Sequence, residues 1–357
     1  LELIDLFQKT QYILHLDNYH PETLKSQLLS IEKKGVVVPA SMYLILSEHI
    51  KNNDGYNAYL LAAYNGEKYI SEQIDSILNQ LNSDVTIFVC LDKSSDRTLE
   101  LINQYVKSNI NIKLVSHSAR FGSAGKNFFH LIKSVDVSGF DFVAFADQDD
   151  IWLPEKLSRA ASTLIEKGYD AYSSNVLAFW EDGKKKLIHK SSPQAEFDYL
   201  FESPGPGCTF LFKVALFREI QLHIINRYDD IDLLWLHDWF CYSFARFNGY
   251  AWKIDSKPTM LYRQHTDNEV GANASFTALF SRFKTVASGD GLNLVLNQAQ
   301  FIGQDSLKAV GNLHSGRIGF LKLASTFYKY RRKPIDKVFC LILFLLLAVK
   351  GFKRKAY

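Results

Sequence analysis

The chain has 357 residues, of which 47% are hydrophobic, 22% charged and 14% aromatic, and its formal net charge is +3. This balance excludes a disordered chain and suffices for one large α/β domain with an appendage. None of the cysteines forms a Cys-x-x-Cys pair, so zinc and redox chemistry are disfavoured and a reducing compartment is expected; they are Cys90, Cys208, Cys241 and Cys340. Residues 1–10 carry acids and no long apolar core, so no secretory signal is expected there.

Residues 1–55 are expected to form a helical N-terminal appendage that carries no chemistry. Apolar residues recur in it at helical spacing, and Asn52-Asn53-Asp54-Gly55 is a strong chain breaker. We therefore place a domain boundary at residue 55. Whether the appendage packs on the next domain or binds a partner is left open by the sequence.

Strands and helices alternate between residues 58 and 146. The expected strands are Ala58–Ala63, Val85–Leu91, Lys113–Ser116 and Phe140–Ala146, with a helix after each of the first three. Such alternation predicts an α/β fold, in which a mainly parallel sheet is covered by helices on both faces. Ligands bind such sheets beyond the carboxyl ends of the strands. The residues at those ends are Tyr64, Asn65, Asp92 and Asp147–Asp150.

The pattern changes after a helix expected at residues 154–167. Further strands are expected at Ala171–Asn175, Cys208–Phe212, Ala251–Ile254 and Thr259–Tyr262, and helices at Val214–Ile220 and Leu234–Phe247. This second half completes the sheet and builds a site for a second substrate. The expected division is a catalytic domain at 56–275, with halves at 56–150 and 151–275, and a helical C-terminal region at 276–357.

The C-terminal region is strongly basic and partly apolar. Lys322–Tyr357 contains ten basic residues and one acid, and the twelve residues Val338–Val349 are all apolar with cations on both sides. A spanning helix needs about 20 apolar residues, so this one is expected to lie in the membrane interface. The partner is then a membrane and not nucleic acid. The alternatives are a buried terminal helix or a contact in a homo-oligomer. We expect a cytoplasmic protein that is peripheral at the inner face of the cell membrane.

Asp147-Gln148-Asp149-Asp150 follows a strand whose last five residues carry no charge. Three carboxylates within four residues repel one another unless a cation lies between them. Oxygen ligands suit Mg²⁺ or Mn²⁺, which prefer a few carboxylates together with substrate phosphates. We therefore predict a site for one of these ions. The alternative is an acidic turn that caps the following helix.

Asp92 ends the second strand within LDKSSDRT. A carboxylate there could accept the N3–H of a pyrimidine base, and the alternative is that Asp92 or Asp96 caps the next helix. Asp238, between His237 and Trp239, is a candidate general base because partial burial raises the basicity of a carboxylate. The alternative for Asp238 is an ordinary residue at a helix terminus.

Three further segments carry polar or loop residues suited to a site. Arg263 could hold a phosphate through its guanidinium fork, and His265 could add a ligand to the metal, although a lone histidine is more often structural. The segment Gly205–Thr209 is expected to form a tight loop that lines an acceptor pocket. Lys126 is a candidate donor contact, but no Gly-x-Gly-x-x-Gly fingerprint accompanies it.

Six motifs in this order resemble those of the inverting family-2 glycosyltransferases, and most closely the bacterial rhamnosyltransferases of surface polysaccharide synthesis. They are AAYNGEKYISEQIDSILNQ, LDKSSDRT, FADQDDIWLPEKL, PGPGCTFLF, HDW and YRQHTDN, and they span about residues 59–273. The resemblance implies a GT-A fold, a Rossmann-like nucleotide-diphospho-sugar transferase. Two departures are visible: Leu91-Asp92-Lys93 replaces the usual Asp-Asp-Gly, and Ala63 stands where threonine is frequent.

Matching the motifs residue by residue implies a role for each site residue. Asp238 would deprotonate the acceptor hydroxyl, and Asp92 would bind the base of the donor. The donor-binding set is Ala63, Tyr64, Asn65, Asp92, Lys126, Asp147 and Arg263. The acceptor-binding set is Gly207, Cys208, Thr209, His237 and Trp239, and the metal ligands are Asp147, Asp149 and His265.

The resulting prediction is a metal-dependent glycosyltransferase that moves a sugar with inversion from a nucleotide-diphosphate donor to a glycan or lipid-linked acceptor. The resemblance favours dTDP-rhamnose as the donor, and UDP-hexoses and UDP-N-acetylhexosamines are the alternatives. An alternative of another class is a non-catalytic, membrane-docked subunit that binds sugars. The acids at Asp147, Asp149 and Asp238 argue against it, because binding alone requires no base. A phosphodiesterase would need more histidines near the acids.

Overall fold

The structure is a computed structural model that describes residues 55–118, 120–265 and 290–352. The expected N-terminal appendage, apart from Gly55, lies outside the described residues. So do residues 266–289, which span the end of the expected catalytic domain, and the last five residues of the basic tail.

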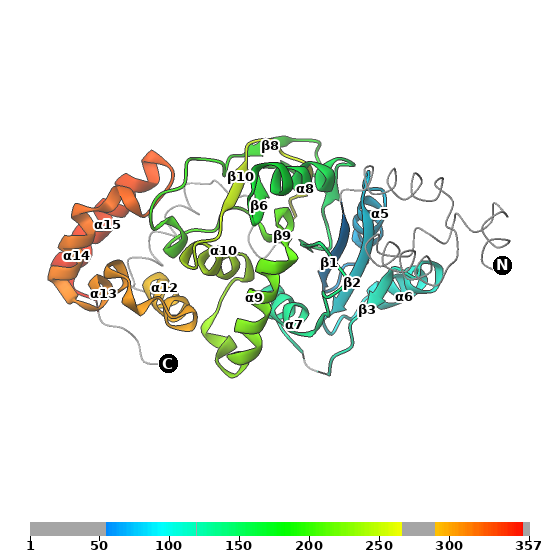
Figure 1. Cartoon of the computed structure of the whole chain (residues 1–357), viewed down its shortest axis with the longest axis horizontal. Helices are drawn as coiled ribbons and strands as arrows, with labels where there is room; N and C mark the ends of the chain where they lie inside the picture. Colours follow the sequence, from blue (N-terminus) through cyan, green and yellow to red (C-terminus); the bar gives the residue numbers. More distant parts are fainter. Residues whose placement is uncertain (1–54, 119, 266–289, 353–357) are drawn as a thin grey trace, which may run out of the picture.

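A seven-stranded, mainly parallel sheet forms the centre of the molecule, which confirms the predicted fold class (Figure 1). Its strand order is β10-β6-β9-β4-β1-β2-β3, and only β9 runs antiparallel to its neighbours. The strands are β1 (Tyr56–Ala63), β2 (Asp84–Leu91), β3 (Ile112–Leu114), β4 (Phe142–Ala146), β6 (Ala171–Ser174), β9 (Leu211–Lys213) and β10 (Trp252–Asp255). Four of them are the strands predicted between residues 58 and 146.

Strand β1 lies within the sheet, and its alternating side chains enter two hydrophobic cores because successive residues of a strand point to opposite faces. Ala58, Leu60 and Ala62 belong to one core, which includes side chains from α7 (Ala124–Ser134), α9 (Val214–Asn226) and α10 (His237–Phe247). Tyr59, Leu61 and Ala63 belong to the other, with side chains from α5 (Ile70–Leu78), α6 (Thr98–Ser108) and α8 (Lys156–Lys167). Helices therefore cover both faces of the sheet.

A second, four-stranded sheet was not predicted. Its order is β5-β11-β7-β8, formed by β5 (Ile151–Trp152), β11 (Met260–Arg263), β7 (Val176–Phe179) and β8 (Lys185–Ile188). Met260 pairs with Trp152 across the antiparallel β5–β11 contact. This pairing brings the end of β11 next to the acidic loop that follows β4.

Two predicted elements begin later than expected. In place of a strand from Cys208, residues Gly207–Thr209 form a 3-10 turn, because the Thr209 N–H and hydroxyl both donate to the Pro206 carbonyl, at 3.0 and 2.8 Å. The strand begins only at Leu211. Helix α10 begins at His237 and not at Leu234, because Leu236 is extended, with φ −117° and ψ 128°.

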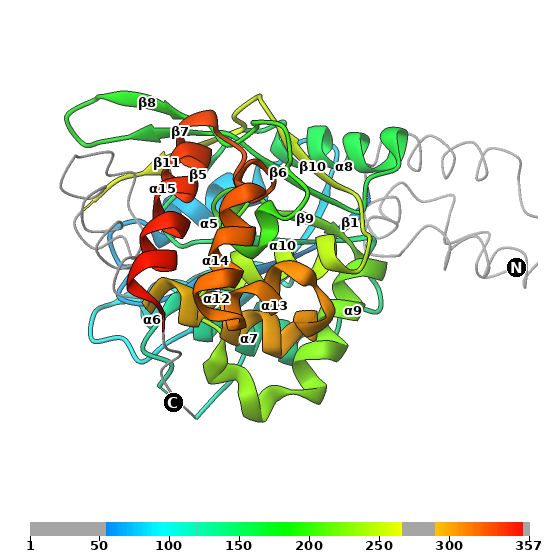
Figure 2. The ribbon, with the colours of Figure 1, turned by 90° about the vertical axis from the view of Figure 1, so that its left-hand side faces the viewer.

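Helices form the end of the molecule farthest from α6 and β3 (Figures 1 and 2). They are α12 (Asp290–Ile302), α13 (Lys308–His314), α14 (Gly316–Ser325) and α15 (Pro334–Lys350). Short 3-10 turns lie at Asp198–Leu200, Tyr228–Leu233, Gln304–Ser306 and Phe327–Lys329. One face of α15 is buried, through Cys340, Phe344, Leu347 and Ala348. Among the described helices, none has the length and apolar character needed to cross a membrane.

Candidate active site

Gln148, in the middle of the acidic loop, joins that loop to the loop after β1. Its side-chain amide donates to the Tyr64 carbonyl and accepts from the Tyr64 N–H, both at 2.8 Å. Gly66 leaves room for this amide, because a Cβ there would lie 2.4 Å from Oε1 of Gln148 and would displace it. Sequence analysis gave Gln148 no role, and its only signal was a polar residue between two candidate ligands.

Asn65 joins the loop after β1 to the loop after β2. Its N–H donates to the Ser94 hydroxyl and its side-chain carbonyl accepts from the Ser95 N–H, both at 2.9 Å. Asn65 has a φ of 44°, in the left-handed region that asparagine tolerates better than most residues. The three strand-end segments singled out from the sequence are thus linked by direct hydrogen bonds.

Asp92 is buried at the end of β2 and accepts three backbone hydrogen bonds, from Lys93 at 2.7 Å, Phe121 at 3.0 Å and Gly122 at 2.8 Å. Burial alone would raise the pKa of Asp92, but these hydrogen bonds outweigh it and lower the pKa. The carboxylate therefore fixes the turn at Gly122. Its contact with the donor base stays a prediction. At the start of α6 it is Asp96, not Asp92, that accepts the first amide, from Thr98 at 3.1 Å.

Asp149 is buried and contacts both residues singled out on β11 and just after it. Its carboxylate Oδ2 lies 2.7 Å from Nε2 of His265, and its carbonyl accepts from Nε of Arg263 at 2.7 Å. Tyr69 stacks on the His265 ring, and the Arg263 guanidinium lies 4.4 Å from the centre of the Tyr69 ring. Arg263 also pairs with Glu72. Arg263 thus anchors the acidic loop, and its contact with a donor phosphate stays a prediction.

The acids fit a divalent cation, and two nearby residues do not fit the role of ligand. Asp147, Asp150 and Cys208 offer ligand atoms within 4.8 Å of one another. Cys208 is fully buried, and burial raises the pKa of its thiol, which makes it a poor ligand for a hard cation that prefers oxygen. Asp150 is fully buried and accepts the Arg263 N–H at 3.0 Å. The predicted ligand set of Asp147, Asp149 and His265 stays a prediction, supported by the 2.7 Å contact between Asp149 and His265.

Lys156 is the buried first residue of α8 and follows the acidic loop and β5; sequence analysis assigned it no role. Its Nζ lies 3.5 Å from the centre of the Trp152 ring. Burial lowers the pKa of Lys156 to about 7, and the charges of Cys208 and Asp150 counteract this only in part. No local sequence signal distinguishes this lysine from a solvent-exposed one.

Asp238 lies in the first turn of α10 and is partly buried. Its carboxylate accepts from the Trp239 N–H at 2.6 Å and from the Ser203 hydroxyl at 3.1 Å. Burial raises the pKa of Asp238 to about 6, against the opposing effects of these two hydrogen bonds and of Lys190. Such a group is mostly ionised at neutral pH and basic enough to accept a proton, as a general base must be.

The two neighbours of Asp238 face the protein core. His237 stacks on Phe128 with ring centres 3.9 Å apart, and burial lowers its pKa to about 3. Trp239 donates from Nε1 to the Tyr199 carbonyl at 2.9 Å. A Cβ at Gly207 would lie 2.3 Å from Nε2 of His237, so glycine is needed there. The acceptor contacts predicted for His237, Trp239 and Gly207 stay predictions.

The segment from Ser203 to Cys208 connects the candidate base with the acidic loop. Ser203 contacts Asp238, whereas Cys208 lies beside Asp147 and Asp150. Five residues extend over at most about 18 Å, so the two chemical groups lie at the two ends of one short segment. Thr209, predicted with Gly207 and Cys208 to contact the acceptor, is buried in the turn that ends this segment.

Lys126 lies in the first turn of α7, where the Ser123 hydroxyl accepts its N–H at 3.3 Å. Its side chain forms an exposed ion pair with Asp232 at 2.6 Å. The helix can approach the chain just before α10 because Gly125 has no Cβ, which would lie 2.6 Å from the Trp235 carbonyl. Lys126 is therefore next to the segment that leads to Asp238, and its donor contact stays a prediction.

Comparisons with known proteins agree with this geometry. Residues 60–221 match the family described as Glycosyl transferase family 2. The chain is 44% identical over 288 residues to dTDP-rhamnosyl transferase RfbG of Shigella flexneri, covering 80% of this chain and 99% of that protein. It is 32% identical over 186 residues to UDP-Glc:alpha-D-GlcNAc-diphosphoundecaprenol beta-1,3-glucosyltransferase WfgD of Escherichia coli, covering 50% and 67%. Among solved structures, S. aureus TarS 1-349 with UDP has a TM-score of 0.48 at 16% identity, covering 83% and 90%, too low a likeness to support an argument.

The mainly parallel sheet with three linked strand-end loops, taken with these comparisons, defines a glycosyltransferase of the GT-A fold. The 44% identity to the Shigella protein, over 99% of that protein's length, is high enough to show the family of this chain. The chain belongs to glycosyltransferase family 2.

Proposed function

We propose that this enzyme transfers rhamnose from dTDP-rhamnose to a hydroxyl of a glycan or lipid-linked acceptor, with inversion, in the synthesis of a bacterial surface polysaccharide. The observation that carries the proposal is the 44% identity over 99% of a protein described as a dTDP-rhamnosyl transferase. The proposed catalytic domain is residues 56–275, with its donor-binding half at 56–150.

The proposed reaction is a single displacement in which each residue has one task. The acceptor oxygen attacks the anomeric carbon from the face opposite the diphosphate, and its proton passes to the carboxylate of Asp238. The bond between the anomeric carbon and the diphosphate oxygen breaks, and the nucleoside diphosphate leaves. Tyr64, Asn65 and Asp92 are proposed to hold the nucleotide, because they end neighbouring strands of the sheet.

The proposed cofactor is Mg²⁺ or Mn²⁺, held by Asp147 and Asp149 with His265 as a third ligand. A bound divalent cation would neutralise the charge that develops on the departing diphosphate. The 2.7 Å contact between Asp149 and His265 supports this set, because both side chains already converge on one point. Arg263 and Gln148 keep the loop that carries these acids in place.

A donor screen tests the proposed substrate. With Mn²⁺ present and no added acceptor, water replaces the acceptor hydroxyl, and the purified protein is expected to hydrolyse dTDP-rhamnose to dTDP and rhamnose faster than it hydrolyses UDP-glucose, UDP-galactose or UDP-N-acetylglucosamine. Release of nucleoside diphosphate is measured with a coupled assay, and boiled protein is the control. The Escherichia coli relative is described as a glucosyltransferase that uses UDP-Glc. If UDP-glucose is the preferred donor here too, the proposed rhamnose donor is wrong, but the proposed sugar transfer still holds. If no nucleotide sugar is cleaved, the enzymatic proposal itself fails.

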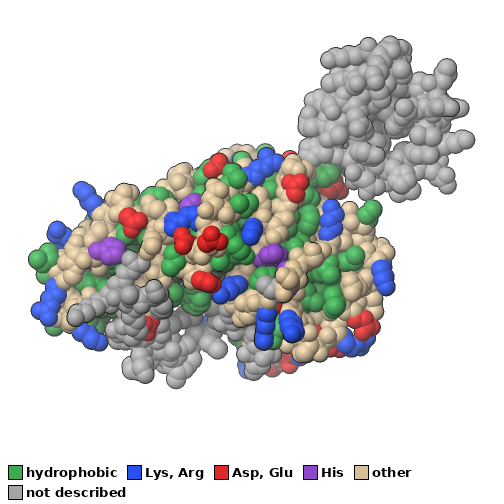
Figure 3. Space-filling model, turned by 90° about the horizontal axis from the view of Figure 1, so that it is seen from below, with side chains coloured by type: hydrophobic (Ala, Val, Ile, Leu, Met, Phe, Trp, Pro, Cys, Tyr) green, Lys and Arg blue, Asp and Glu red, His purple; other side chains and the backbone are tan. Residues whose placement is uncertain are grey.

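We also propose that α14 and α15 dock on the inner face of the cell membrane. Apolar side chains of α15 recur on its exposed face at the spacing of one helical surface, namely Val338, Ile342, Leu345, Leu346 and Val349. Exposed Arg317, Lys322 and Lys350 lie near the ends of the two helices. Figure 3 shows basic and hydrophobic side chains together at this end of the molecule. An apolar face with a basic rim fits an anionic lipid surface.

Vesicle binding tests the docking face. The wild-type protein is expected to co-sediment with vesicles of phosphatidylcholine and phosphatidylglycerol, and a Leu346→Glu, Val349→Glu variant is expected to stay in the supernatant. The control is Ile110→Glu, which changes an even more exposed apolar residue at the opposite end of the molecule. If the double variant still binds, the lipid surface is not formed by α15. If the wild-type protein is a dimer and the double variant is a monomer, the exposed face of α15 is a contact between two copies of the chain.

A further inference from the structure

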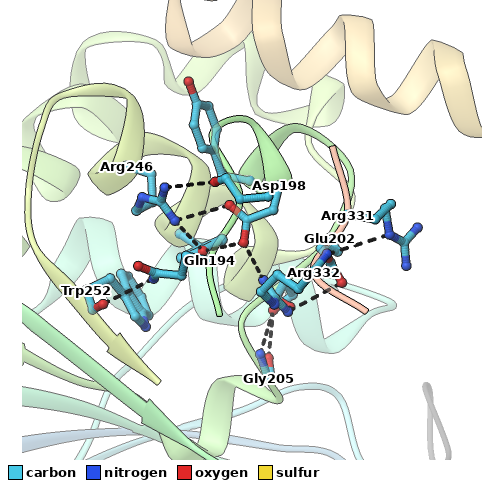
Figure 4. Close-up of polar contacts among 12 residues, drawn as sticks. Gln194, Asp198, Glu202, Gly205, Arg246, Trp252, Arg331 and Arg332 are labelled. Carbon is cyan, nitrogen blue, oxygen red and sulfur yellow. Dashed lines mark hydrogen bonds and ion pairs between the residues drawn. The ribbon is translucent and has the colours of Figure 1, made fainter. Parts of the chain in front are cut away.

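A buried network of charges joins the start of α15 to the helix that carries Asp238 (Figure 4). At its centre is Asp198, which is fully buried. One oxygen of Asp198 accepts from Arg246 at 3.1 Å, and the other accepts from Arg332 at 2.9 Å. Arg332 is itself only 4% exposed, and its backbone N–H donates to Glu202 at 2.7 Å. Arg332 is therefore one of the residues that tie the C-terminal helices to the catalytic domain, and its side chain reaches a buried acid.

The network contacts the helix face that presents the candidate base. Asp238, Tyr242 and Arg246 are spaced by four residues on α10, which places them on one face of the helix. The Tyr242 hydroxyl donates to Asp198 at 2.8 Å and accepts from Arg246 at 2.6 Å. Asp198 thus fixes the second and third turns of this face, and Asp238 occupies the first.

Arg332 also reaches the residue that hydrogen-bonds the base. Its second terminal nitrogen donates to the Ser203 carbonyl at 2.6 Å. The Ser203 hydroxyl lies 3.1 Å from Asp238 and 2.6 Å from the Gly205 carbonyl. A hydroxyl has one hydrogen to donate, so Asp238 and the closer Gly205 carbonyl compete for it.

We propose that Arg332 is a positioning residue for sugar transfer: by holding the Ser203 carbonyl next to Asp198, it keeps the Ser203 hydroxyl within hydrogen-bonding distance of Asp238. The inference rests on the proposed role of Asp238 as the base. A buried arginine is by itself weak support for stability, because desolvation of the ion pair offsets most of its attraction. Its guanidinium fork, however, holds Asp198 and Ser203 at once, which a lysine ammonium at a single point does not reproduce.

The charged and titratable groups around Asp238 determine how the effect is measured. Lys190, which follows β8, and Cys241, on the next turn of α10, both interact with Asp238, and Glu202, Arg332 and Lys333 interact with Lys190. A change at Arg332 therefore acts on Asp238 through Ser203 and through Lys190. Removing a positive charge would alter both routes, so the test variant must keep the charge.

Arg332→Lys keeps the charge and removes the fork. Asp238 then loses a hydrogen bond to its ionised form, which raises its pKa. In a plot of kcat/KM against pH, the acidic limb is therefore expected to move up by about one pH unit. A roughly ten-fold loss of kcat with an unchanged donor KM is expected to accompany the shift. Ser203→Ala is expected to give the same shift, and the double variant no further one, since both changes remove one interaction. Arg331→Lys is the matched control, because Arg331 pairs with Glu202 and Asp336 and reaches neither Ser203 nor Asp198.

Three outcomes would overturn the inference. One is an Arg332→Lys variant with a lower Tm and a wild-type acidic limb, which describes a purely structural residue. Another is an additive shift in the double variant. The third is an unshifted limb in Ser203→Ala, which decides the question even if Arg332→Lys does not fold. An inactive Asp238→Asn enzyme combined with any of these leaves the proposed base intact, whereas an active Asp238→Asn enzyme refutes the base itself.

Discussion

The Asp238→Asn variant is expected to lose about 10²–10⁴-fold in kcat while binding the nucleotide sugar as the wild type does. The asparagine side chain has nearly the same shape; its oxygen can still accept from the Trp239 N–H, and its amide nitrogen can donate to the Ser203 hydroxyl oxygen. It cannot take a proton from the acceptor. Steady-state transfer assays measure the loss, and isothermal titration with the donor measures the retained affinity.

The same residue predicts a dependence on pH. Burial raises the pKa of Asp238 to about 6, and a base acts only when ionised, so wild-type activity is expected to fall as the pH drops through about 6. The control is Asp230→Asn, a change at an exposed acid that pairs only with Arg227 among the contacts described for it. Near-normal turnover of Asp238→Asn would show that another group takes the proton.

The Asp149→Asn variant is expected to lose about 10²–10³-fold in activity and to bind Mn²⁺ more weakly. The substitution removes the charge of one of the two proposed carboxylate ligands, and metal stabilisation of a leaving group is worth several kcal/mol. It also weakens the attraction between Asp149 and His265, which lie 2.7 Å apart. Electron paramagnetic resonance of free Mn²⁺ measures the binding directly, without any turnover.

The control for this variant is Asp182→Asn, which removes an exposed acid paired with Lys184 on the β7–β8 hairpin. It is expected to leave Mn²⁺ binding and transfer unchanged. If Asp149→Asn binds Mn²⁺ as tightly as the wild type, or if transfer persists undiminished in excess chelator, the acidic loop is not a metal site.

The local pattern of the sequence predicts the first half of the fold well. Strand β4 is fully buried and its residues Phe142–Ala146 are all apolar, so its position and the polar loop beyond it follow from hydrophobicity alone. The second sheet has no such signal. Strand β8 consists of Lys185–Ile188 and is largely exposed, so a charged, partly solvated hairpin reads as a loop.

The candidate site was predictable where it depends on residues that follow strands, and unpredictable where it depends on contacts distant in sequence. Asp92 and Asp149 were found because chain position alone places them at one sheet edge. Gln148 and Arg332 were missed, because their partners Tyr64 and Ser203 are 84 and 129 residues away. Only the folded chain reveals such pairs.

The central claim is that the acids after β4 gather a divalent cation for the diphosphate of the donor. The measurement that tests it most directly is anomalous diffraction from crystals grown with Mn²⁺ and dTDP. We expect one strong manganese peak within about 2.3 Å of a carboxylate oxygen of Asp149, close to Asp147 and His265 and next to the β-phosphate of dTDP. Bound dTDP with no manganese peak at these side chains, or with manganese elsewhere, would contradict it.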